Sequence, residues 1–378
     1  MTGALAAHHG GSAPWASGPP SGTPCALFDL RGLDQRLRDC AAGAEARDIT
    51  LAYSIKTNPM PAILRQARAA GFAAEAISGA EVAAAVTAGF RPDQIVLGGV
   101  AKSWPTGSIA PGLMASLDDT LDGFAAGVRA SRGHRYHCVR LRFPAVGSRL
   151  GFDTTTFDQR ERLATALLDA RADGVPVGLA IHEHNVPIAR AEAWLTGIRS
   201  MLNGLNHAHP GILGIIECLD LGGGYDAACL DDLLWGDLGK ALLEYVQDRV
   251  PRCRTLILEP GKSLVQAYGA VIGTVLALHP DDEVCVDASM AELPWPMSRR
   301  PVSVWRNRRW TQIGEGTGTI AGRCTAETDI LATSVDTAGL VPGDRLMFAE
   351  AGAYDWSMRN AFGTATVIET IPGDDAAA

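Results

Sequence analysis

The chain has 378 residues, of which 47% are hydrophobic, and it carries a formal net charge of -9 with a pI near 5.5. This length can bury a large core and suits two domains, and the composition excludes a fibrous or wholly disordered protein. Because nucleic acids and anionic membranes bind basic surfaces, the acidic balance argues against both as partners and favours a small-molecule substrate.

Residues 1–22 are rich in Ala, Gly, Ser and Pro and lack the basic-then-apolar order of a signal peptide, so we predict a disordered tail there. The eight cysteines form no C-x-x-C pair, and several lie within apolar runs, which predicts reduced thiols and a cytoplasmic location. No apolar run reaches the ~18 residues of a membrane span. We assign no metal site.

From residue 49 onward, short apolar runs alternate with longer segments of helical periodicity. Eight β-α repeats of this length are what a closed (β/α)8 barrel needs, and nearly continuous apolar strands suit a sheet covered on both faces. A doubly wound open sheet is the alternative fold. The predicted strands are Leu51–Ile55, Ala73–Ile77, Gln94–Gly98, Leu113–Leu117, Tyr136–Arg142, Pro176–His182, Ile215–Leu221 and Arg254–Leu258. The predicted helices include Ala62–Ala70, Glu81–Ala88, Gln159–Arg171, Ile188–Met201 and Leu230–Val250.

Strand-like segments return after residue 262 without a strong helical pattern among them, which predicts a second, mainly β domain. We therefore expect a barrel over residues 47–261 and a β domain over residues 262–378. An early strand at Cys25–Asp29, within residues 23–46, precedes the barrel. The later predicted strands are Leu264–Leu278, Glu283–Asp287, Val302–Trp305, Asp329–Thr333 and Arg345–Glu350.

Polar residues recur at the ends of the predicted barrel strands. In (β/α)8 enzymes the carboxyl ends of the strands form the active site, so this recurrence predicts one shared site. The residues that follow this pattern, in strand order, are Lys56, Glu75, Arg142, His182, Gly222-Gly223-Gly224 and Glu259.

Three of these features suggest chemistry from the residues alone. Lys56 ends an apolar strand, where a desolvated amine can act as a nucleophile; the alternative is an ordinary surface lysine. The glycines Gly222–Gly224 can direct backbone N–H groups at an anion such as phosphate, although a bare tight turn is equally consistent with them. Glu259 emerges from a buried strand and needs a partner, which could be a structural cation instead of a ligand.

Several motifs together resemble the fold-type III pyridoxal-phosphate (PLP) decarboxylases, the family of the diaminopimelate, ornithine and arginine decarboxylases. The motifs are "YSIKTN" around Lys56, "EAISGAE", "IVLGG", "LDLGGGYD", "EPGK", "VDASM", "GDRL" and "EAGAYDWSM". The resemblance covers roughly residues 23–370. It implies a PLP-binding barrel like that of alanine racemase, a C-terminal β domain, and an N-terminal strand within residues 23–46 that joins the β domain.

The resemblance also implies roles for individual residues. Lys56 would carry the cofactor as a Schiff base, Glu259 would hold the proton of the pyridine ring, and His182 would lie flat on the ring. Asn185 stands where the family has a serine that meets the phosphate. The implied cofactor-binding residues are Lys56, Glu75, Arg142, His182, Asn185, Gly222, Gly223, Gly224, Glu259, Gly261 and Tyr354.

Departures from the family pattern bear on the substrate. The loop between Arg142 and Gly151 is short, and the arginine of the family's "EPGR" is Lys262 here. The family's "R-P-x-x-Y" tyrosine is Val304, after Arg300-Pro301. Because a point charge replaces a planar fork of donors, capture of a distal carboxylate is weakened, and we expect diaminopimelate not to be the substrate.

The proton donor of the family lies in "C-E-S-x-D", which matches the segment that ends at Asp329 imperfectly. An ungapped match anchored on Asp329 puts Thr325 at the cysteine position and Cys324 one residue early, so either is a candidate. Lys262, Arg300 and Asp329 would lie at the substrate end. In the family this segment completes the partner subunit's active site, which implies a homodimer with shared sites.

These features predict a PLP-dependent decarboxylase of an amino acid or an amino-acid conjugate, acting in a specialised pathway such as siderophore biosynthesis. A tryptophan-rich neighbourhood would suit a conjugated substrate: Trp295, Trp305, Trp310 and Trp356. One alternative is an amino-acid racemase or epimerase, which needs a second acid–base group opposite Lys56. The other is a non-catalytic binding protein of the same fold.

Overall fold

The computed structural model describes residues 18–100, 102, 112–130, 133–143, 148–297, 300–360, 362 and 367–371. Most of the predicted tail, residues 1–17, and part of the predicted short loop, residues 144–147, lie outside the described residues. The chain forms two compact units. The barrel unit is Arg36–Leu264, and the β unit combines the described residues of Met1–Gln35 and Val265–Ala378.

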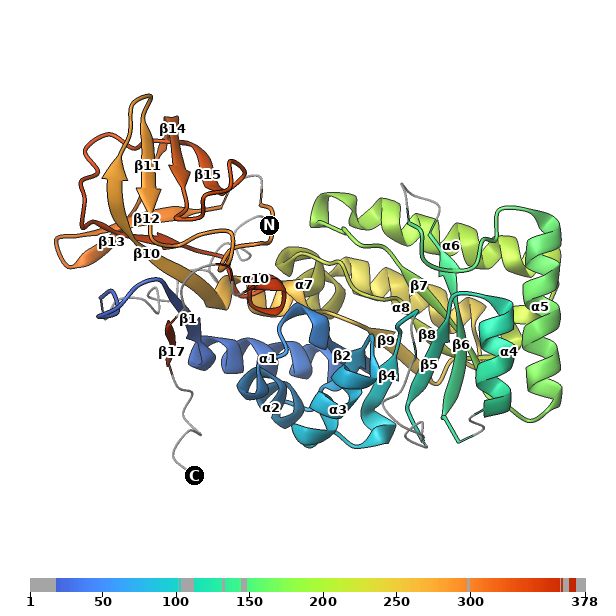
Figure 1. The fold of residues 1–378 in the computed structure, drawn as a ribbon. Coiled ribbons are helices and arrows are strands. Elements are labelled where there is room, and N and C mark those ends of the chain that lie inside the picture. Colours follow the sequence, from blue (N-terminus) through green and yellow to red (C-terminus); the bar gives the residue numbers. More distant parts are fainter. Residues whose placement is uncertain are drawn as a thin grey trace. The chain divides into compact units, whose positions relative to one another are not determined.

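The barrel unit is a closed ring of eight parallel strands with helices around it (Figure 1). Successive strands pair in chain order, and the last strand returns to the first through the pairs of Ile49 with Leu256 and Leu51 with Leu258. This closure confirms the predicted (β/α)8 barrel and excludes the open sheet. The strands are β2 (Ile49–Ser54), β3 (Ala73–Ala76), β4 (Ile95–Leu97), β5 (Ala115–Asp118), β6 (Tyr136–Arg142), β7 (Val177–His182), β8 (Ile216–Asp220) and β9 (Thr255–Leu258).

Helices connect most of these strands, with one difference from the prediction. The expected helix Leu230–Val250 is two helices divided at Gly236, where the backbone is extended (φ -101°, ψ -167°). A Cβ at Gly236 would lie 1.6 Å from Asp232 Oδ1, so a larger residue at the break would require the Asp232 side chain to move. The helices are α1 (Leu30–Glu45), α2 (Pro61–Ala69), α3 (Gly79–Thr87), α4 (Leu121–Ala130), α5 (Phe157–Ala172), α6 (Ala191–Ala208), α7 (Ala227–Trp235) and α8 (Asp237–Arg249).

The interior of the barrel explains where its functional residues lie. A buried cluster of mostly small side chains fills the ring, including Ala52, Ala73, Cys138, Ala180, Cys218 and Ile257. Because side chains alternate along a strand, the residue two positions further on faces the same interior, one layer closer to the carboxyl end. That next layer consists of Ser54, Glu75, Arg140, His182, Asp220 and Glu259. The polar layer therefore lies at the mouth where barrel enzymes bind their ligands.

The β unit is a nine-stranded sheet in the order β13-β12-β16-β10-β11-β14-β15, in which β1 also pairs with β10 and β17 pairs with β1. The predicted strand Cys25–Asp29 is β1, and it pairs antiparallel with β10 and parallel with β17. The sheet confirms the mainly β second domain. Its strands are β1 (Cys25–Asp29), β10 (Gly269–Leu278), β11 (Glu283–Val286), β12 (Val302–Arg306), β13 (Arg309–Gln312), β14 (Glu315–Ala321), β15 (Ile330–Val335), β16 (Arg345–Phe348) and β17 (Val367–Ile371).

The β unit differs from the prediction at the start of β10 and after β16, and β13, β14 and β17 were not predicted. The strand expected from Leu264 begins only at Gly269, because Lys262–Val265 forms a short helix, α9, and Gln266–Tyr268 a 3-10 turn. A four-residue helix, α10 (Asp355–Met358), follows β16. Valines, leucines and one phenylalanine from β10, β11, β12 and β16 form the core of the unit.

Candidate active site

Lys56 lies in a 3-10 turn, Ile55–Thr57, that directly follows β2. Its Nζ donates to Glu75 Oε2 at 2.6 Å and to Ser54 Oγ at 2.8 Å, and Ser54 Oγ donates to the same Glu75 oxygen at 2.6 Å. Burial acts to raise the pKa of Glu75, but the ion pair and hydrogen bond with Lys56 outweigh it and hold that pKa below its ordinary value. Glu75 is therefore an ionised carboxylate that fixes the lysine amine at the mouth of the barrel.

Glu259 and Asp220 form a pair of buried carboxyl groups on adjacent strand ends. Burial first, and then the charge of Asp220, raise the pKa of Glu259 well above its ordinary value. Burial likewise raises the pKa of Asp220 to about 7, although a hydrogen bond from Gly222 N–H at 2.8 Å to its Oδ1 opposes this. Two adjacent carboxyl groups that are both buried resist double ionisation, so the pair retains a proton at neutral pH. Glu259 Oε1 and Asp220 Oδ2 have no hydrogen-bond partner among the described residues.

His182, the last residue of β7, is neutral at physiological pH. Burial and the nearby charges of Lys56 and Arg140 lower its pKa to about 4. Its Nδ1 accepts a hydrogen bond from Gly223 N–H at 3.2 Å, which fixes the ring plane and leaves the proton on Nε2. A neutral imidazole held in this way suits packing against a flat aromatic ligand better than it suits proton donation.

The glycine loop after β8 is bonded more fully within the protein than we expected. Gly222 N–H donates to Asp220, Gly223 N–H to His182 and Asp226 N–H to the carbonyl of Val186, which leaves Gly224 and Tyr225 as the part of the loop that can bind an anion. Gly222 and Gly224 have φ of +64° and +87°, so side chains are excluded there. The exposed Asn185 lies beside this loop, because its neighbour Val186 bridges to Tyr225.

Gly261 brings the end of β9 against the lysine segment. A Cβ at Gly261 would lie 2.1 Å from Thr57 Oγ1, and Ser54 N–H donates to the carbonyl of Pro260 at 3.2 Å. A side chain at residue 261 would therefore press against Thr57 and Ser54, which lie on either side of Lys56 in the same segment. Lys262, the next residue, is half-buried at the start of α9.

The structure places Arg140, not Arg142, in the polar layer. Arg142 is exposed at the end of β6, whereas Arg140 is buried and forms a fork to Asp119 with distances of 2.6 and 2.7 Å. The charges of Glu259 and Glu75 also act on Arg140 and contribute to raising its pKa. Ser54, Arg140 and Asp220 are the site residues that sequence reasoning missed. The alternation of the strands, followed two residues forward from the interior cluster, would have found them.

The candidate proton donors lie in the β unit, on the segment between β14 and β15. Asp329 holds this segment: it accepts from Met290 N–H at 2.6 Å and from Cys324 N–H at 2.7 Å. Cys324 is half-buried and Thr325 is exposed, and both line a pocket of about 290 Å³. Burial raises the pKa of the Cys324 thiol, so the thiol keeps its proton at neutral pH. Both carboxylate oxygens of Asp329 are engaged by backbone, which makes it a support for Cys324.

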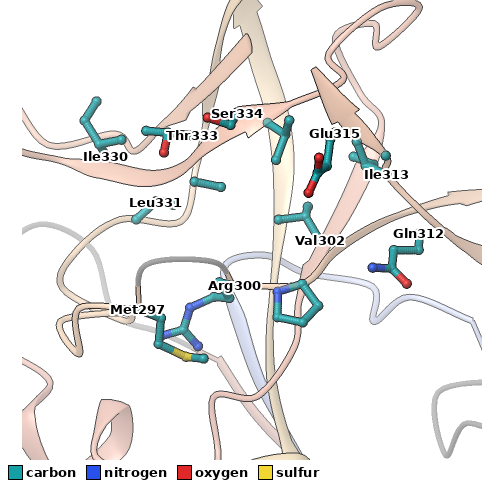
Figure 2. Close-up of a pocket in the computed structure, with 14 residues that line it drawn as sticks. Met297, Arg300, Val302, Gln312, Ile313, Glu315, Ile330, Leu331, Thr333 and Ser334 are labelled. Atoms are coloured by element: carbon teal, nitrogen blue, oxygen red, sulfur yellow. The ribbon is translucent and has the colours of Figure 1, made fainter. Parts of the chain in front are cut away.

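Two residues expected at the substrate end have other surroundings. Val304 is 8% exposed and belongs to the core of the β unit, so the valine that replaces the family's tyrosine faces the interior. Arg300 adjoins a pocket of about 300 Å³ (Figure 2), but its guanidinium forms a buried ion pair with Asp355 at 2.9 Å. The arginine is therefore engaged within the protein.

The residues of the barrel mouth fit PLP. The unpartnered oxygens of Glu259 and Asp220 match the pyridinium N–H, a neutral His182 matches the ring face, and the positive-φ loop at Gly224 matches a phosphate. Lys56 would supply the amine. Among the described residues there is no group of His, Cys, Asp or Glu that could hold a metal ion.

Comparisons with known proteins agree with this fit. The family model for the pyridoxal-binding domain of pyridoxal-dependent decarboxylases matches residues 32–106. Diaminopimelate decarboxylase from Zymomonas mobilis is 26% identical over 93% of this chain and 87% of its own. Its counterpart from Deinococcus radiodurans is 28% identical over 90% of this chain and 87% of its own.

These matches support the resemblance of the chain to the fold-type III PLP-dependent decarboxylases. They support an amino-acid carboxy-lyase whose cofactor is PLP. Two solved structures share the fold of this chain. Arginine decarboxylase of Paramecium bursaria Chlorella virus has a TM-score of 0.72 at 17% identity, covering 92% of this chain and 96% of its own. Helicobacter pylori diaminopimelate decarboxylase with L-lysine has a TM-score of 0.73 at 18% identity, covering 93% and 92%.

The relatives from Zymomonas mobilis and Deinococcus radiodurans are named diaminopimelate decarboxylases, which does not support our expectation that diaminopimelate is excluded as a substrate. That expectation stays a prediction. Among the residues that the structure describes, no helix is both long and apolar enough to span a membrane. All eight cysteines are free thiols, and five of them are buried.

Proposed function

We propose that this protein removes the α-carboxylate of an amino acid or amino-acid conjugate that lacks the distal carboxylate of diaminopimelate, with PLP attached to Lys56. The observation that supports the attachment is the ion-paired lysine at the barrel mouth, on a wall that also carries the buried Glu259–Asp220 pair. When bound, PLP supplies a protonated ring that accepts the electron pair left by the departing CO2.

The protein's own residues bind the cofactor and return the proton. Glu259 holds the proton of the ring nitrogen, and the neutral His182 covers one face of the ring. The loop at Gly224 binds the phosphate, with Gly261, Asn185 and Tyr354 as further ligands. Cys324 returns one proton to the α carbon, because its thiol stays protonated at neutral pH while the hydroxyl of Thr325 is a much weaker acid.

Two cations of the protein, Arg300 and Lys262, are the candidates to bind a carboxylate at the distal end of the substrate. Arg300 would be the planar, bidentate group for a second carboxylate, but its guanidinium is engaged by Asp355. Lys262 offers only a point charge. Val304, which replaces the family's tyrosine, is buried in the core of the β unit and gives no indication of the substrate.

We also infer a homodimer in the cytoplasm, in which the Cys324 segment of one subunit serves the partner subunit's site. The exposure of Thr325 and of the residues up to Thr328 supports an interface there. A racemase needs two opposed acid–base groups, and His182 is a poor proton donor with a pKa of about 4. The ion pair of Lys56 with Glu75 argues against a non-catalytic binding protein.

The experiment is release of CO2 from a panel of L- and D-amino acids and their conjugates, with meso-diaminopimelate included. We expect release from substrates that end in an amine, an amide or an apolar group, and little from diaminopimelate. Efficient production of lysine from diaminopimelate would refute the substrate proposal while leaving the decarboxylase intact. Interconversion of enantiomers without CO2 would instead establish a racemase.

A further inference from the structure

Tyr354 adopts a strained backbone conformation in the β unit. Its φ is +66° and its ψ is -37°, and the N–H of Asp355 donates to the carbonyl of Ala353 at 2.9 Å. Tyr354 is therefore the central residue of a γ-turn of the rare, strained kind with positive φ. Such a conformation persists only where the surroundings hold it, and residues in this state concentrate at functional sites.

The ring of Tyr354 stacks on the indole of Trp295. The ring centroids are 4.3 Å apart and the planes are inclined by 26°. The backbone N–H of Trp295 also donates to Asp355 Oδ1 at 3.0 Å. Trp295 thus contacts the ring of Tyr354 and is bonded to the very next residue, so it constrains both the side chain and the turn.

The buried Arg300–Asp355 ion pair completes this arrangement. Arg300 Nη2 lies 2.9 Å from Asp355 Oδ2, and the two side chains are only 3% and 2% exposed. The same guanidinium donates to the carbonyls of Trp295 at 3.3 Å and of Ala349 and Glu350 at 3.2 Å each. One planar group therefore ties together Trp295, the strand end before the turn and the residue after Tyr354.

We propose that Trp295, Arg300 and Asp355, here called the Tyr354 clamp, hold the phenol of Tyr354 in the orientation in which it binds the cofactor phosphate. This inference rests on the proposed function, which assigns Tyr354 to the phosphate. It makes the three residues positioning residues, whose effect on cofactor affinity passes through Tyr354. It also explains why Arg300, expected at the substrate, is buried: its fork of donors is used to hold the turn.

The test is the affinity of the apoprotein for PLP, measured by absorbance titration, in single and double variants. Tyr354→Phe removes the hydroxyl that binds the phosphate, and Trp295→Ala removes the ring that orients this hydroxyl. Each variant should therefore raise the Kd about tenfold. Trp295→Phe, which keeps an aromatic partner, should bind as the wild type does. Trp295→Ala in the Tyr354→Phe background should add nothing, since the effect of Trp295 passes through the missing hydroxyl.

Two further variants separate positioning from general destabilisation. Arg300→Met with Asp355→Leu removes both buried charges together, which preserves folding better than either single change, and it should also raise the Kd about tenfold. Trp310→Ala removes a tryptophan that packs on Trp305 in the same unit, and it should leave the Kd unchanged. Thermal unfolding of each variant verifies that it is folded.

Three results would overturn the clamp. If Tyr354→Phe weakens PLP binding but Trp295→Ala and the Arg300–Asp355 double variant do not, the clamp is wrong and the phosphate role of Tyr354 stands. If Trp295→Ala weakens binding further in the Tyr354→Phe background, Trp295 acts by another route. If Tyr354→Phe binds PLP normally, the phosphate role of Tyr354 and the clamp fall together, while attachment to Lys56 is tested separately.

Discussion

Glu259 and Asp220 show how burial sets the chemistry of a single residue. An exposed pair of carboxyl groups would be doubly ionised at neutral pH, but burial and mutual repulsion keep a proton on this pair. The nitrogen of a pyridine ring bound beside this pair would therefore face two carboxyl groups that carry one proton and one negative charge.

Glu259→Gln should preserve PLP binding but lower kcat about 10- to 100-fold. A neutral amide cannot stabilise a positive ring nitrogen, and a hydrogen bond to a charged group contributes about 1.5–3 kcal/mol. Glu217→Gln is the matched control, because Glu217 lies on the neighbouring strand β8 and pairs with Arg171. Turnover of the Glu259 variant at the wild-type rate would show that the ring nitrogen is not the electron sink.

Asp220→Asn should change how stability depends on pH. Asp220 has a folded pKa of about 7 against an ordinary 3.8, so its stabilising proton is fully present below pH 4 and is lost as pH rises through 7. The variant should therefore gain stability relative to the wild type as pH rises from 4 to 8. Urea unfolding of both proteins across this range measures the difference, and a constant difference would contradict the assignment.

The sequence indicated which residues lie at strand ends, but it did not show which way each side chain points. Lys56, Glu75, His182 and Glu259 follow apolar runs, and all four lie in the barrel mouth. Arg142 also ends a run, yet its side chain is exposed while that of Arg140 points inward. The ion pair of Arg300 could not be predicted, because its partner lies 55 residues away and on another element.

Among the elements, the glycine loop after β8 depends most on its sequence. A Cβ at Gly224 would lie 2.2 Å from the carbonyl oxygen of Glu183, and the residue has φ +87°. The loop can thus follow its path beside His182 only with glycine at this position. The positive φ values of the loop are what turn its later N–H groups toward an anion.

Gly224→Ala should raise the Kd for PLP about tenfold or more, since a non-glycine residue with positive φ costs about 1–2 kcal/mol and the clash adds to it. Gly214→Ala is the control, because a Cβ there meets nothing within 4 Å. PLP titration of the two apoproteins makes the comparison. Unchanged affinity in the Gly224 variant would remove the loop from the phosphate site.

The barrel strands were predictable as elements because buried parallel strands are apolar throughout. Two strands of the β unit were not. Arg309–Gln312 and Glu315–Ala321 are β13 and β14, but most of their residues are exposed or half-buried, and glycines interrupt the apolar alternation. The division of α7 from α8 was missed because the helical period continues across Gly236. The extended backbone at Gly236 in the structure shows the break.

On the scale of the whole molecule, the two units carry different parts of the proposed chemistry. The lysine, the acidic pair and the glycine loop belong to the barrel unit, and the candidate proton donors belong to the β unit. The order of apolar runs predicted a barrel followed by a β domain. Assembly could not be derived from the same pattern, because it depends on surface complementarity that periodicity does not encode.

If the Cys324 segment serves the partner subunit's site, two inactive variants should rescue one another. Equal amounts of Lys56→Ala and Cys324→Ala chains should recover about a quarter of wild-type activity after dissociation and reassociation, because half of the dimers are mixed and each mixed dimer has one intact site. Thr325→Ala is the matched control and should be active by itself. An active monomer, or a fully active Cys324 variant, would disprove the shared site.

The central claim is that Lys56 carries the cofactor, and covalent trapping tests it most directly. Borohydride reduction of the purified holoprotein, followed by proteolysis and mass spectrometry, should place a pyridoxyl phosphate group on the peptide that contains Lys56. The same treatment of Lys56→Ala should label no other lysine, although the variant remains folded. Labelling of Lys102, Lys240 or Lys262 in the wild type, with Lys56 unmodified, would contradict the account.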